Sequence, residues 1–504
     1  MPHRLGFDNE KYLEEQSRAI KERAGRIGGK LYLEFGGKIA YDFHAARVLP
    51  GYDPNVKIRL LQTLRDQVEI LICIYAGAIE QRKVRADFGV PYDADVLRLI
   101  DDLREWNLEV RGLVITRFEH QPAACKFKAR LERRGVRVFT HRFTSGYPTD
   151  VDRIVSKLGY GANEYIPTER PIVVVAGPGP GSGKLATCLS QLYHEHLRGA
   201  EAGYAKFETF PIWNLPLKHP VNVAYEAATV ELKDVNQIDP YHLAAYGVQA
   251  VNYNRDIEAF PLLARILQRL GSASFYQSPT DMGVNRAGFA IVDDEVVRAA
   301  AEQEVIRRYF RYACEYALGL VEREDAERAQ LLMNELGLDE TKRPVVLPAR
   351  RAAAEAEAKG KGNNGAYCGA AIALSNGSII TGKNSPLMHA ASAAVLNAVK
   401  YLSGLPDEIP LLSPNVIESI ASLKKNVLNM KAVSLSLEET LIALGISATT
   451  NPAAQIAIER LRDLGGCEFH TTHLPTSGDE AGLRKLGLNI TSDPQFATSS
   501  LALV

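Results

Sequence analysis

The order of strands and helices between Leu31 and Ala176 constrains the fold of this chain more than any other feature. Apolar runs of strand length alternate there with segments of helical periodicity. The predicted strands cover residues 68–75, 112–116, 136–140 and 171–176, and the predicted helices cover residues 93–106 and 122–134. Such units with short connections form parallel sheets that are buried on both faces. We therefore expect an α/β protein whose N-terminal domain is a Rossmann-like parallel sheet.

Changes in composition divide the rest of the chain. An irregular stretch, 207–220, precedes long helical patterns, which cover residues 262–270, 294–320 and 323–336. Arg350–Gly365 consists of small and polar residues, and indicates a linker or an exposed helix that opens into a mobile loop. We predict an α/β phosphate-loop domain over 1–205, a mainly helical domain over 206–345 and a smaller α/β domain over 346–504.

The last of these domains begins with a hairpin signal. Ser375-Asn-Gly377 lies between two apolar runs, and Asn-Gly favours a tight turn between antiparallel strands. A helix is expected from about Ala390 to Leu402. Further strands are expected at Cys467–His470 and Leu488–Thr491.

Charge and cysteine usage exclude several classes of protein. The 504 residues carry 59 Lys and Arg against 60 Asp and Glu, so no overall field attracts nucleic acid or an anionic membrane. The longest apolar run, 68–79, is shorter than the ~20 residues that cross a bilayer, and the N-terminus lacks a signal-peptide pattern. Six scattered cysteines indicate reduced thiols rather than disulfides. We expect a cytoplasmic protein that binds neither nucleic acid nor membrane and, from its size class alone, a homo-oligomer.

The strand at 171–176 runs into a glycine-rich loop, Gly177-Pro-Gly-Pro-Gly-Ser-Gly-Lys184. Alternating glycines let backbone amides turn toward an anion, and the following helix N-terminus and a lysine add positive charge. We expect this loop to bind phosphate, and the predicted ligand-binding residues are Gly179, Gly181, Ser182, Gly183 and Lys184.

The loop departs from a Walker A motif in two places. Pro178 stands where the first glycine belongs, and Leu185 stands where Ser or Thr binds Mg²⁺. Thr187 lies three residues past the lysine, where its side chain points away from that ligand position. The alternative is a tight strand–helix turn whose lysine pairs with a local carboxylate.

Two segments further along could complete the site. Gly288–Glu295 has the form of an apolar strand that ends in acid, so Asp293 is a candidate metal ligand; a helix N-cap at Asp293 or Asp294 is the alternative. The turn-rich segment 278–285 predicts a binding loop that contributes Asp281 and Asn285.

A third polar group follows the Gly-Gly turn at 36–37. If residues 41–45 are extended, Asp42 and His44 share one face and form a candidate acid–base pair. A surface group of salt bridges is the alternative. Cys467, His470 and His473 do not converge on a strand, so we expect no zinc site.

Specific strings suggest a family. With the loop at 177–184, Ser278-Pro-Thr-Asp-Met-Gly-Val-Asn285 and Ser385-Pro-Leu-Met-His-Ala-Ala391, the chain resembles a bacterial family of uncharacterised proteins of about this length. Some members carry the label ATP-dependent peptidase. The resemblance runs from near Leu5 to the end and implies no assigned activity, and this sequence has no protease motif.

The C-terminal part also resembles the start of a cytidine-deaminase-like domain, in which His-Ala-Glu supplies a zinc ligand and the general acid/base. Here Ala391 replaces the glutamate, and Ala453 and Ile456 stand where cysteines would bind zinc. The resemblance therefore implies a topology used for binding or assembly, without zinc-dependent deamination.

Together these patterns predict a protein that binds a nucleotide, such as ATP, or a small phosphorylated metabolite. We expect either an enzyme that acts on this ligand or a non-catalytic nucleotide sensor or assembly protein.

Overall fold

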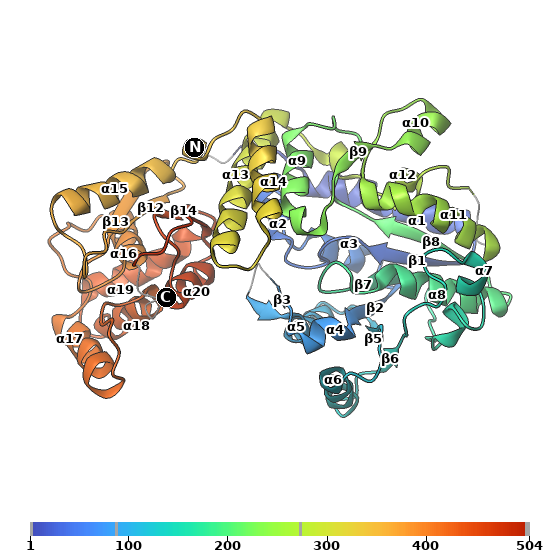
Figure 1. The fold of residues 1–504 in the computed structure, drawn as a ribbon, viewed down its shortest axis with the longest axis horizontal. Coiled ribbons are helices and arrows are strands. Elements are labelled where there is room, and N and C mark those ends of the chain that lie inside the picture. The colour runs from blue at the N-terminus through green and yellow to red at the C-terminus, as the bar shows by residue number, and fades with distance from the viewer. Residues whose placement is uncertain (1–3, 86–88, 272–274, 499–504) are drawn as a thin grey trace. The chain divides into compact units, whose positions relative to one another are not determined.

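The structure, a computed structural model, describes residues 4–85, 89–271 and 275–498 (Figure 1). The chain divides into two compact units, an N-terminal unit that ends at Ala301 and a C-terminal unit that begins at Glu302. A two-way division cannot test the three domains predicted from composition, which stay a prediction. None of the described helices is long and apolar enough to cross a membrane.

The N-terminal unit is built on one parallel sheet. Its seven strands are β1 (Lys30–Phe35), β2 (Val68–Tyr75), β5 (Val110–Thr116), β6 (Val138–Thr140), β7 (Ile172–Ala176), β8 (Ala202–Phe207) and β11 (Gly283–Val284). Their order is β11-β8-β1-β7-β2-β5-β6, and every neighbouring pair is parallel. The predicted parallel sheet is confirmed. All seven carboxyl ends therefore meet at one edge.

Helices surround this sheet. They are α1 (Asn9–Ile27), α2 (Phe43–Val48), α3 (Val56–Thr63), α4 (Ala76–Glu80), α5 (Tyr92–Glu105), α6 (Pro122–Glu132), α7 (Val151–Ile154), α8 (Lys184–Leu197), α9 (Pro220–Ala228), α10 (Pro240–Tyr246), α11 (Asn254–Arg269), α12 (Pro279–Met282) and α13 (Asp294–Ala317), the last continuing past Ala301. Two short hairpins pair β3 (Val84–Arg85) with β4 (Val90–Pro91) and β9 (Asn236–Ile238) with β10 (Val251–Tyr253).

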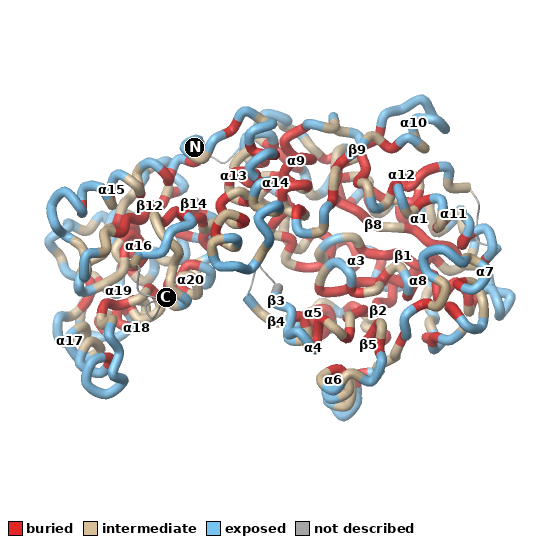
Figure 2. The backbone as a smooth tube through the Cα atoms, viewed as in Figure 1, coloured by how far each residue is buried: buried red, intermediate tan, exposed pale blue. Residues whose placement is uncertain are grey.

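The central strands are covered on both faces. Every residue of β7 is buried, as Figure 2 shows for the middle of the sheet. Val173 and Val175 pack with apolar residues of α8 and α11, such as Leu189 and Leu263. Because side chains alternate along a strand, the burial of Val174 requires cover on the other face as well.

The chain leaves two neighbouring strands in opposite directions. From β1 it crosses toward β2, and from β7, which lies between β1 and β2, it crosses back toward β8 beyond β1. Oppositely directed connections leave a crevice between the carboxyl ends of the two strands, where open α/β sheets bind ligands. The glycine-rich loop follows β7 at this place.

Two sequence expectations for this unit are wrong, and one of its strands was not expected from the sequence. Residues 202–207 form β8, which pairs with β1 on one side and with β11 on the other. Gly203 and Ala205 have low strand propensity, but this position inside the sheet outweighs that propensity. Residues 287–290 form a 3₁₀ helix instead of the strand expected within 288–295. Residues 43–48 form α2, so the segment 41–45 is not extended.

The C-terminal unit holds a smaller mixed sheet. Its strands are β12 (Gly369–Ala373), β13 (Ile379–Lys383), β14 (Glu468–Thr471) and β15 (Asn489–Ser492), and its helices are α14 (Arg323–Glu335), α15 (Val346–Ala358), α16 (Ala390–Leu402), α17 (Pro414–Ser422), α18 (Leu437–Ser447), α19 (Pro452–Glu459) and α20 (Ser477–Lys485). The order is β13-β12-β14-β15; β12 is antiparallel to β13 and β14, and β14 is parallel to β15. The expected hairpin and the helix at 390–402 are confirmed.

The segment expected to be a linker or an exposed helix is instead packed against this sheet. Ala349, Ala352 and Ala356 of α15 are buried, and a Cβ on Gly369 of β12 would lie 2.2 Å from the Ala349 carbonyl oxygen. The small side chains that suggested a linker are what permit this close approach of helix and strand.

Candidate functional site

The glycine-rich loop joins β7 to α8, which confirms the predicted strand–loop–helix order. Gly181 and Gly183 have φ values of 71° and 89°, in the left-handed region that glycine adopts without strain. A Cβ on Gly183 would lie 2.6 Å from Thr116 Oγ1, at the end of β5. Both backbone angle and space therefore require glycine at position 183.

The carbonyl groups of the loop are held by neighbouring side chains. Ser182 Oγ donates to the Gly179 carbonyl at 2.8 Å, and Thr116 Oγ1 donates to the Ser182 carbonyl at 2.8 Å. The guanidinium of Arg117 donates to the Gly181 carbonyl. These three carbonyls of the loop are thus engaged within the protein.

Three backbone amides of the loop are not engaged in this way. The amides of Gly179, Gly181 and Gly183 have no hydrogen-bond acceptor among the described residues, and no side chain caps α8. Lys184 is 8% exposed, and its Nζ donates to the Gly179 carbonyl at 3.4 Å. Within the described chain we find no carboxylate paired with it, so the alternative of a local ion pair is not observed. The arrangement leaves amides and an ammonium group for an anion.

Magnesium chemistry has little support at this loop. Leu185 occupies the position of the Mg²⁺-binding hydroxyl, as the sequence shows. Thr187 is fully buried, and its Oγ1 accepts a hydrogen bond from Cys73 Sγ at 3.4 Å. Thr187 therefore faces the sheet, as its spacing predicts.

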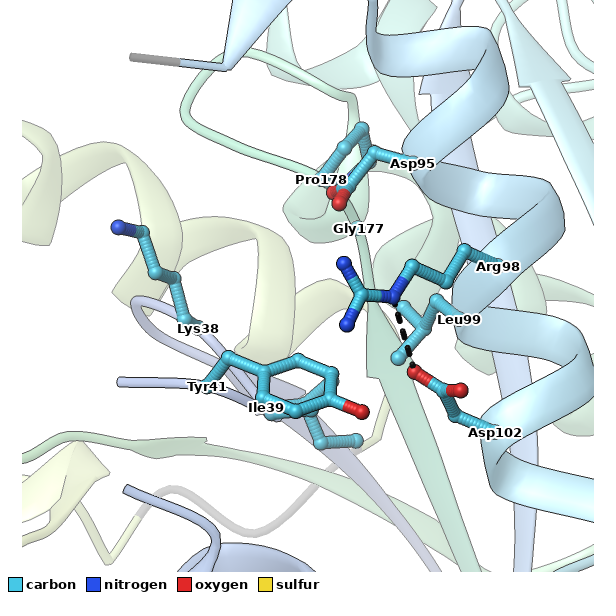
Figure 3. Close-up of a pocket in the computed structure, with 10 residues that line it drawn as sticks. Lys38, Ile39, Tyr41, Asp95, Arg98, Leu99, Asp102, Gly177 and Pro178 are labelled. Atoms are coloured by element: carbon cyan, nitrogen blue, oxygen red, sulfur yellow. Dashed lines mark ion pairs between the residues drawn. The ribbon is translucent and has the colours of Figure 1, made fainter. Parts of the chain in front are cut away.

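A cleft lies beside the start of the loop (Figure 3). It is bounded by Gly177 and Pro178 after β7, by residues 38–41 after β1, and by one side of α5. The two loops belong to the strands whose connections diverge, so the cleft coincides with the crevice that the topology predicts.

Asp42 and His44 lie in the segment after β1, in α2 and its N-cap. The Asp42 side chain accepts from the Ala45 amide at 3.2 Å and pairs with the buried Lys57 Nζ at 2.8 Å. Burial alone would raise the pKa of Asp42, but the ammonium groups of Lys57 and Lys38 lower it to about 2. Asp42 is therefore ionised at neutral pH. The His44 ring packs edge-on against Phe210 at 5.3 Å between centroids.

Asp281 and Asn285 lie at different ends of β11. Asn285 follows the strand, and its side-chain amide donates to the carbonyls of Thr209 and Pro211, so it braces the segment after β8. Asp281 precedes the strand in α12, and its carboxylate accepts from the Tyr246 hydroxyl at 2.8 Å. Only Asn285 lies at the carboxyl edge that carries the glycine loop.

Asp293 precedes α13. Its Oδ2 pairs with Arg4 Nε at 2.6 Å, and its Oδ1 accepts from the Val296 amide at 3.3 Å. These contacts are those of a helix cap, the alternative that the sequence left open. Across the described residues, no group of three His, Cys, Asp or Glu side chains is arranged to hold a metal ion.

The structure adds a buried charge cluster that sequence reasoning missed. Glu208 follows β8, and its Oε1 pairs with Lys206 Nζ at 2.8 Å; Lys206 also pairs with Asp256 at 2.5 Å. Burial and the nearby Asp256 raise the pKa of Glu208 to about 7, against the opposing charge of Lys206. Glu208 is thus a carboxyl group that exchanges protons near neutral pH.

One signal would have found several of the missed residues. Thr116 and Arg117 end a predicted strand, and residues at the carboxyl ends of parallel strands share one edge. Glu208 could not be found this way because β8 was not predicted.

Comparisons with known proteins place the chain in a family. Residues 5–337 match the model described as "Domain of unknown function DUF1846, N-terminal", and residues 341–502 match "Domain of unknown function DUF1846, C-terminal". The chain is 56% identical over 499 residues to a UPF0371 protein of Clostridium tetani, and 57% identical over 500 residues to one of Clostridium botulinum strain 657. Each alignment covers 99% of both chains. The chain belongs to this family.

Proposed function

We propose that this UPF0371 family member binds the phosphate group of a nucleotide or a small phosphorylated metabolite at the Gly179–Lys184 loop, and acts on that ligand as an enzyme. The observation that carries the proposal is the contrast within the loop, where the carbonyls of Gly179, Gly181 and Ser182 accept hydrogen bonds and the amides of Gly179, Gly181 and Gly183 have no acceptor among the described residues. The Rossmann-like interpretation of the sheet supports it, because the loop follows a strand at the topological switch point.

Glu208 is our proposed proton-transfer group. A general acid or base works best with a pKa near the working pH, and Glu208 meets this condition while Asp42 does not. His44 remains a second candidate for proton transfer. Asp42 then forms an ion pair with Lys57 instead of transferring a proton.

A non-catalytic nucleotide sensor is the second candidate. Leu185 and the buried Thr187 favour it, because neither supplies the hydroxyl that positions Mg²⁺ for nucleotide hydrolysis. Turnover assays on any nucleotide that binds separate the two candidates: product formation supports the enzyme, and binding without product supports the sensor.

Isothermal titration calorimetry tests the binding itself. Wild type, Lys184→Ala and a control, Lys157→Ala at an exposed lysine of the same unit, are titrated with ATP, GTP, NAD and inorganic phosphate. We expect wild type and the control to bind at least one of these probes equally, and Lys184→Ala to bind it at least tenfold more weakly. Equal binding by all three proteins, or no binding by wild type, contradicts the proposal.

For the C-terminal unit we propose a role in assembly into a homo-oligomer. Its exposed apolar side chains include Leu423, Val427, Leu428 and Met430, which follow α17, and Ile442 and Ile446 of α18. The cytidine-deaminase-like topology would serve this role without zinc chemistry, since His389 Nδ1 bonds Asp479 Oδ2 at 2.7 Å. Light scattering should give an oligomer for wild type and a smaller species for Val427→Asp; a monomeric wild type contradicts the proposal.

A further inference from the structure

The guanidinium of Arg117 lies against the glycine-rich loop. Arg117 directly follows β5, and β2 lies between β5 and β7, the strand that leads into the loop. The side chain extends over Tyr75, at the end of β2, and donates to the Gly181 carbonyl. An arginine that follows one strand therefore meets the loop that follows another, at the carboxyl edge of the sheet.

The ring of Tyr75 and the Gly181 carbonyl hold this guanidinium in place. Arg117 Cζ lies 3.5 Å from the centre of the ring, and a planar guanidinium stacks on aromatic faces in a way that an ammonium group does not. A Cβ on Gly77 would lie 2.5 Å from Tyr75 Cζ, so glycine at position 77 leaves room for the ring. The cation is thus positioned by tertiary contacts before any ligand binds.

No carboxylate matches the charge of Arg117. Among the described residues its guanidinium has one hydrogen-bond acceptor, the Gly181 carbonyl, and forms no ion pair. A guanidinium carries five donor hydrogens, so most of them remain for a ligand. Arg98, in the wall of the adjoining cleft, differs because its Nε lies 3.7 Å from Asp102 Oδ2. The charge of Arg117 is therefore available at the loop.

Lys184 supplies a second unmatched cation at the same loop. It is 8% exposed, and its ammonium group has one acceptor among the described residues, the Gly179 carbonyl at 3.4 Å. Burial of a charge without a counter-charge is costly. An anion bound to the loop would offset that cost for Lys184 and would lie within reach of the donors of Arg117, because both side chains contact carbonyls of residues 179–181.

We infer that Arg117 binds the ligand at the phosphate site and, together with Lys184, selects a terminal phosphate group. This inference rests on the proposed function. A phosphate monoester carries a charge of about −1.5 to −2 at pH 7, which two cations match. An internal phosphodiester carries a single charge on each phosphate. The ligand class is therefore a nucleotide or metabolite that presents a phosphate monoester to the loop.

Phosphorus NMR titrations with matched probes test the inference. Methyl phosphate, a monoester, is compared with dimethyl phosphate, a diester, in a buffer with EDTA, so that no metal ion supplies the second charge. For wild type we expect methyl phosphate to bind at least tenfold more tightly than dimethyl phosphate. In Arg117→Gln the affinity for methyl phosphate should fall at least fivefold, and the preference for the monoester should fall below threefold.

Arg198→Gln is the matched control. Arg198 follows α8 at its other end, roughly 20 Å from the loop because α8 has 14 residues. Its Cζ also stacks on a tyrosine, 3.6 Å from the centre of the Tyr165 ring, and it donates to the His194 carbonyl at 3.2 Å. The two substitutions remove the same charge and the same kinds of contact. Arg198→Gln should bind methyl phosphate within twofold of wild type.

The outcomes separate this inference from the proposed function. If wild type binds methyl phosphate and requires Lys184, but Arg117→Gln binds it as tightly as wild type, the inference is wrong and the phosphate site stands. Equal losses in Arg117→Gln and Arg198→Gln would show an effect of overall charge and would also overturn the inference.

Wild type itself provides two further outcomes. If wild type binds neither methyl phosphate nor dimethyl phosphate, or does not prefer the monoester, the inference is wrong. If it also binds none of ATP, GTP, NAD and inorganic phosphate, the proposed function is wrong as well. Arg117→Met replaces Arg117→Gln if circular dichroism shows that the latter is unfolded, because the unbranched methionine side chain can still cover the Tyr75 ring.

Discussion

Helix α8 of the N-terminal unit and three helices of the C-terminal unit differ in what satisfies their N-termini. In the C-terminal unit, the carboxylate of Asp479 accepts from the Leu437 amide that begins α18, at 2.9 Å, and from Thr476 Oγ1, the N-cap of α20, at 2.8 Å. His389, the N-cap of α16, donates or shares a proton with the same carboxylate at 2.7 Å. In the N-terminal unit, α8 begins at the glycine loop with no capping side chain.

This difference separates stability from binding. A helix N-terminus attracts negative charge, and three such termini in the C-terminal unit share one built-in carboxylate. The N-terminus of α8 has Lys184 next to it and no carboxylate among the described residues, so the attraction remains available to a ligand. Removing Asp479 should therefore affect folding, and removing Lys184 should affect binding.

The largest effect is expected at Asp479. Asp479→Ala leaves His389, Leu437 and Thr476 without a buried acceptor, and should destabilise the C-terminal unit by about 3–5 kcal/mol. Both tryptophans, Trp106 and Trp213, lie in the N-terminal unit. Tryptophan fluorescence therefore does not report on the C-terminal unit, and urea unfolding followed by circular dichroism should measure the loss of stability in Asp479→Ala. Lys184→Ala should lower the free energy of unfolding by less than about 1 kcal/mol. Equal shifts in the two variants would remove the contrast.

Two glycines with similar backbone angles sharpen the comparison. Gly183 in the loop and Gly377 in the C-terminal hairpin have φ values of 89° and 86°, but only Gly183 has a side chain, that of Thr116, within reach of an added Cβ. Gly377→Ala should cost about 1 kcal/mol from the backbone alone. Gly183→Ala should cost about 2 kcal/mol or more and weaken phosphate binding. Thermal unfolding measures both; a smaller loss for Gly183→Ala would show that the loop moves freely.

Lys184 provides the third test. Lys184→Ala should weaken binding of the tightest phosphate probe at least tenfold, about 1.4 kcal/mol, because a charged hydrogen bond is lost. Asp479→Asn, in the other unit, should leave that affinity unchanged. Loss of binding in both variants would mean that the phosphate site is not confined to the glycine loop.

The last effect, the smallest over a single pH unit, is a pH dependence of opposite sign in the two units. The pKa of Glu208 is raised by burial to about 7 from 4.5, so the folded state binds more protons than the unfolded state between these values. Stability of the N-terminal unit should fall as pH rises through this window, by at most about 1.4 kcal/mol per pH unit. Tryptophan-detected urea unfolding measures the slope, and Glu208→Gln should flatten it.

Asp479 should behave in the reverse manner. Burial opposes ionisation of Asp479, but the contacts with His389 and Thr476 outweigh it and lower the pKa below 3.8. Its contribution to stability is therefore present above pH 3.8 and is lost as the pH falls below that value. A slope of equal sign in both units would contradict the assigned environments.

Much of the N-terminal fold could be predicted because its buried strands are runs of consecutive apolar residues. Ile70–Tyr75 and Ile172–Ala176 are uninterrupted apolar runs, as strands buried on both faces require. The turn Ser375–Gly377 was equally readable from its local chemistry. The strand Ala202–Phe207 was not, because its small residues suit a position between two other strands and carry no periodic signal.

The candidate site divides along the same line. The loop 177–184 was visible because glycine, lysine and the flanking strand and helix are local features. Asp42 and Asp293 looked equally chemical in sequence, yet Lys57 and Arg4 pair with them. Those partners lie 15 and 289 positions away in the chain, and Arg98 and Glu208 meet the edge of the sheet only through packing.

The amino-acid order alone set the parallel sheet and the position of its glycine loop, since apolar periodicity and glycine act over a few neighbouring residues. Tertiary structure alone decided which charged side chains are matched and which are available. Electrostatic pairing depends on distance in space, and the chain brings remote residues within that distance only when it folds.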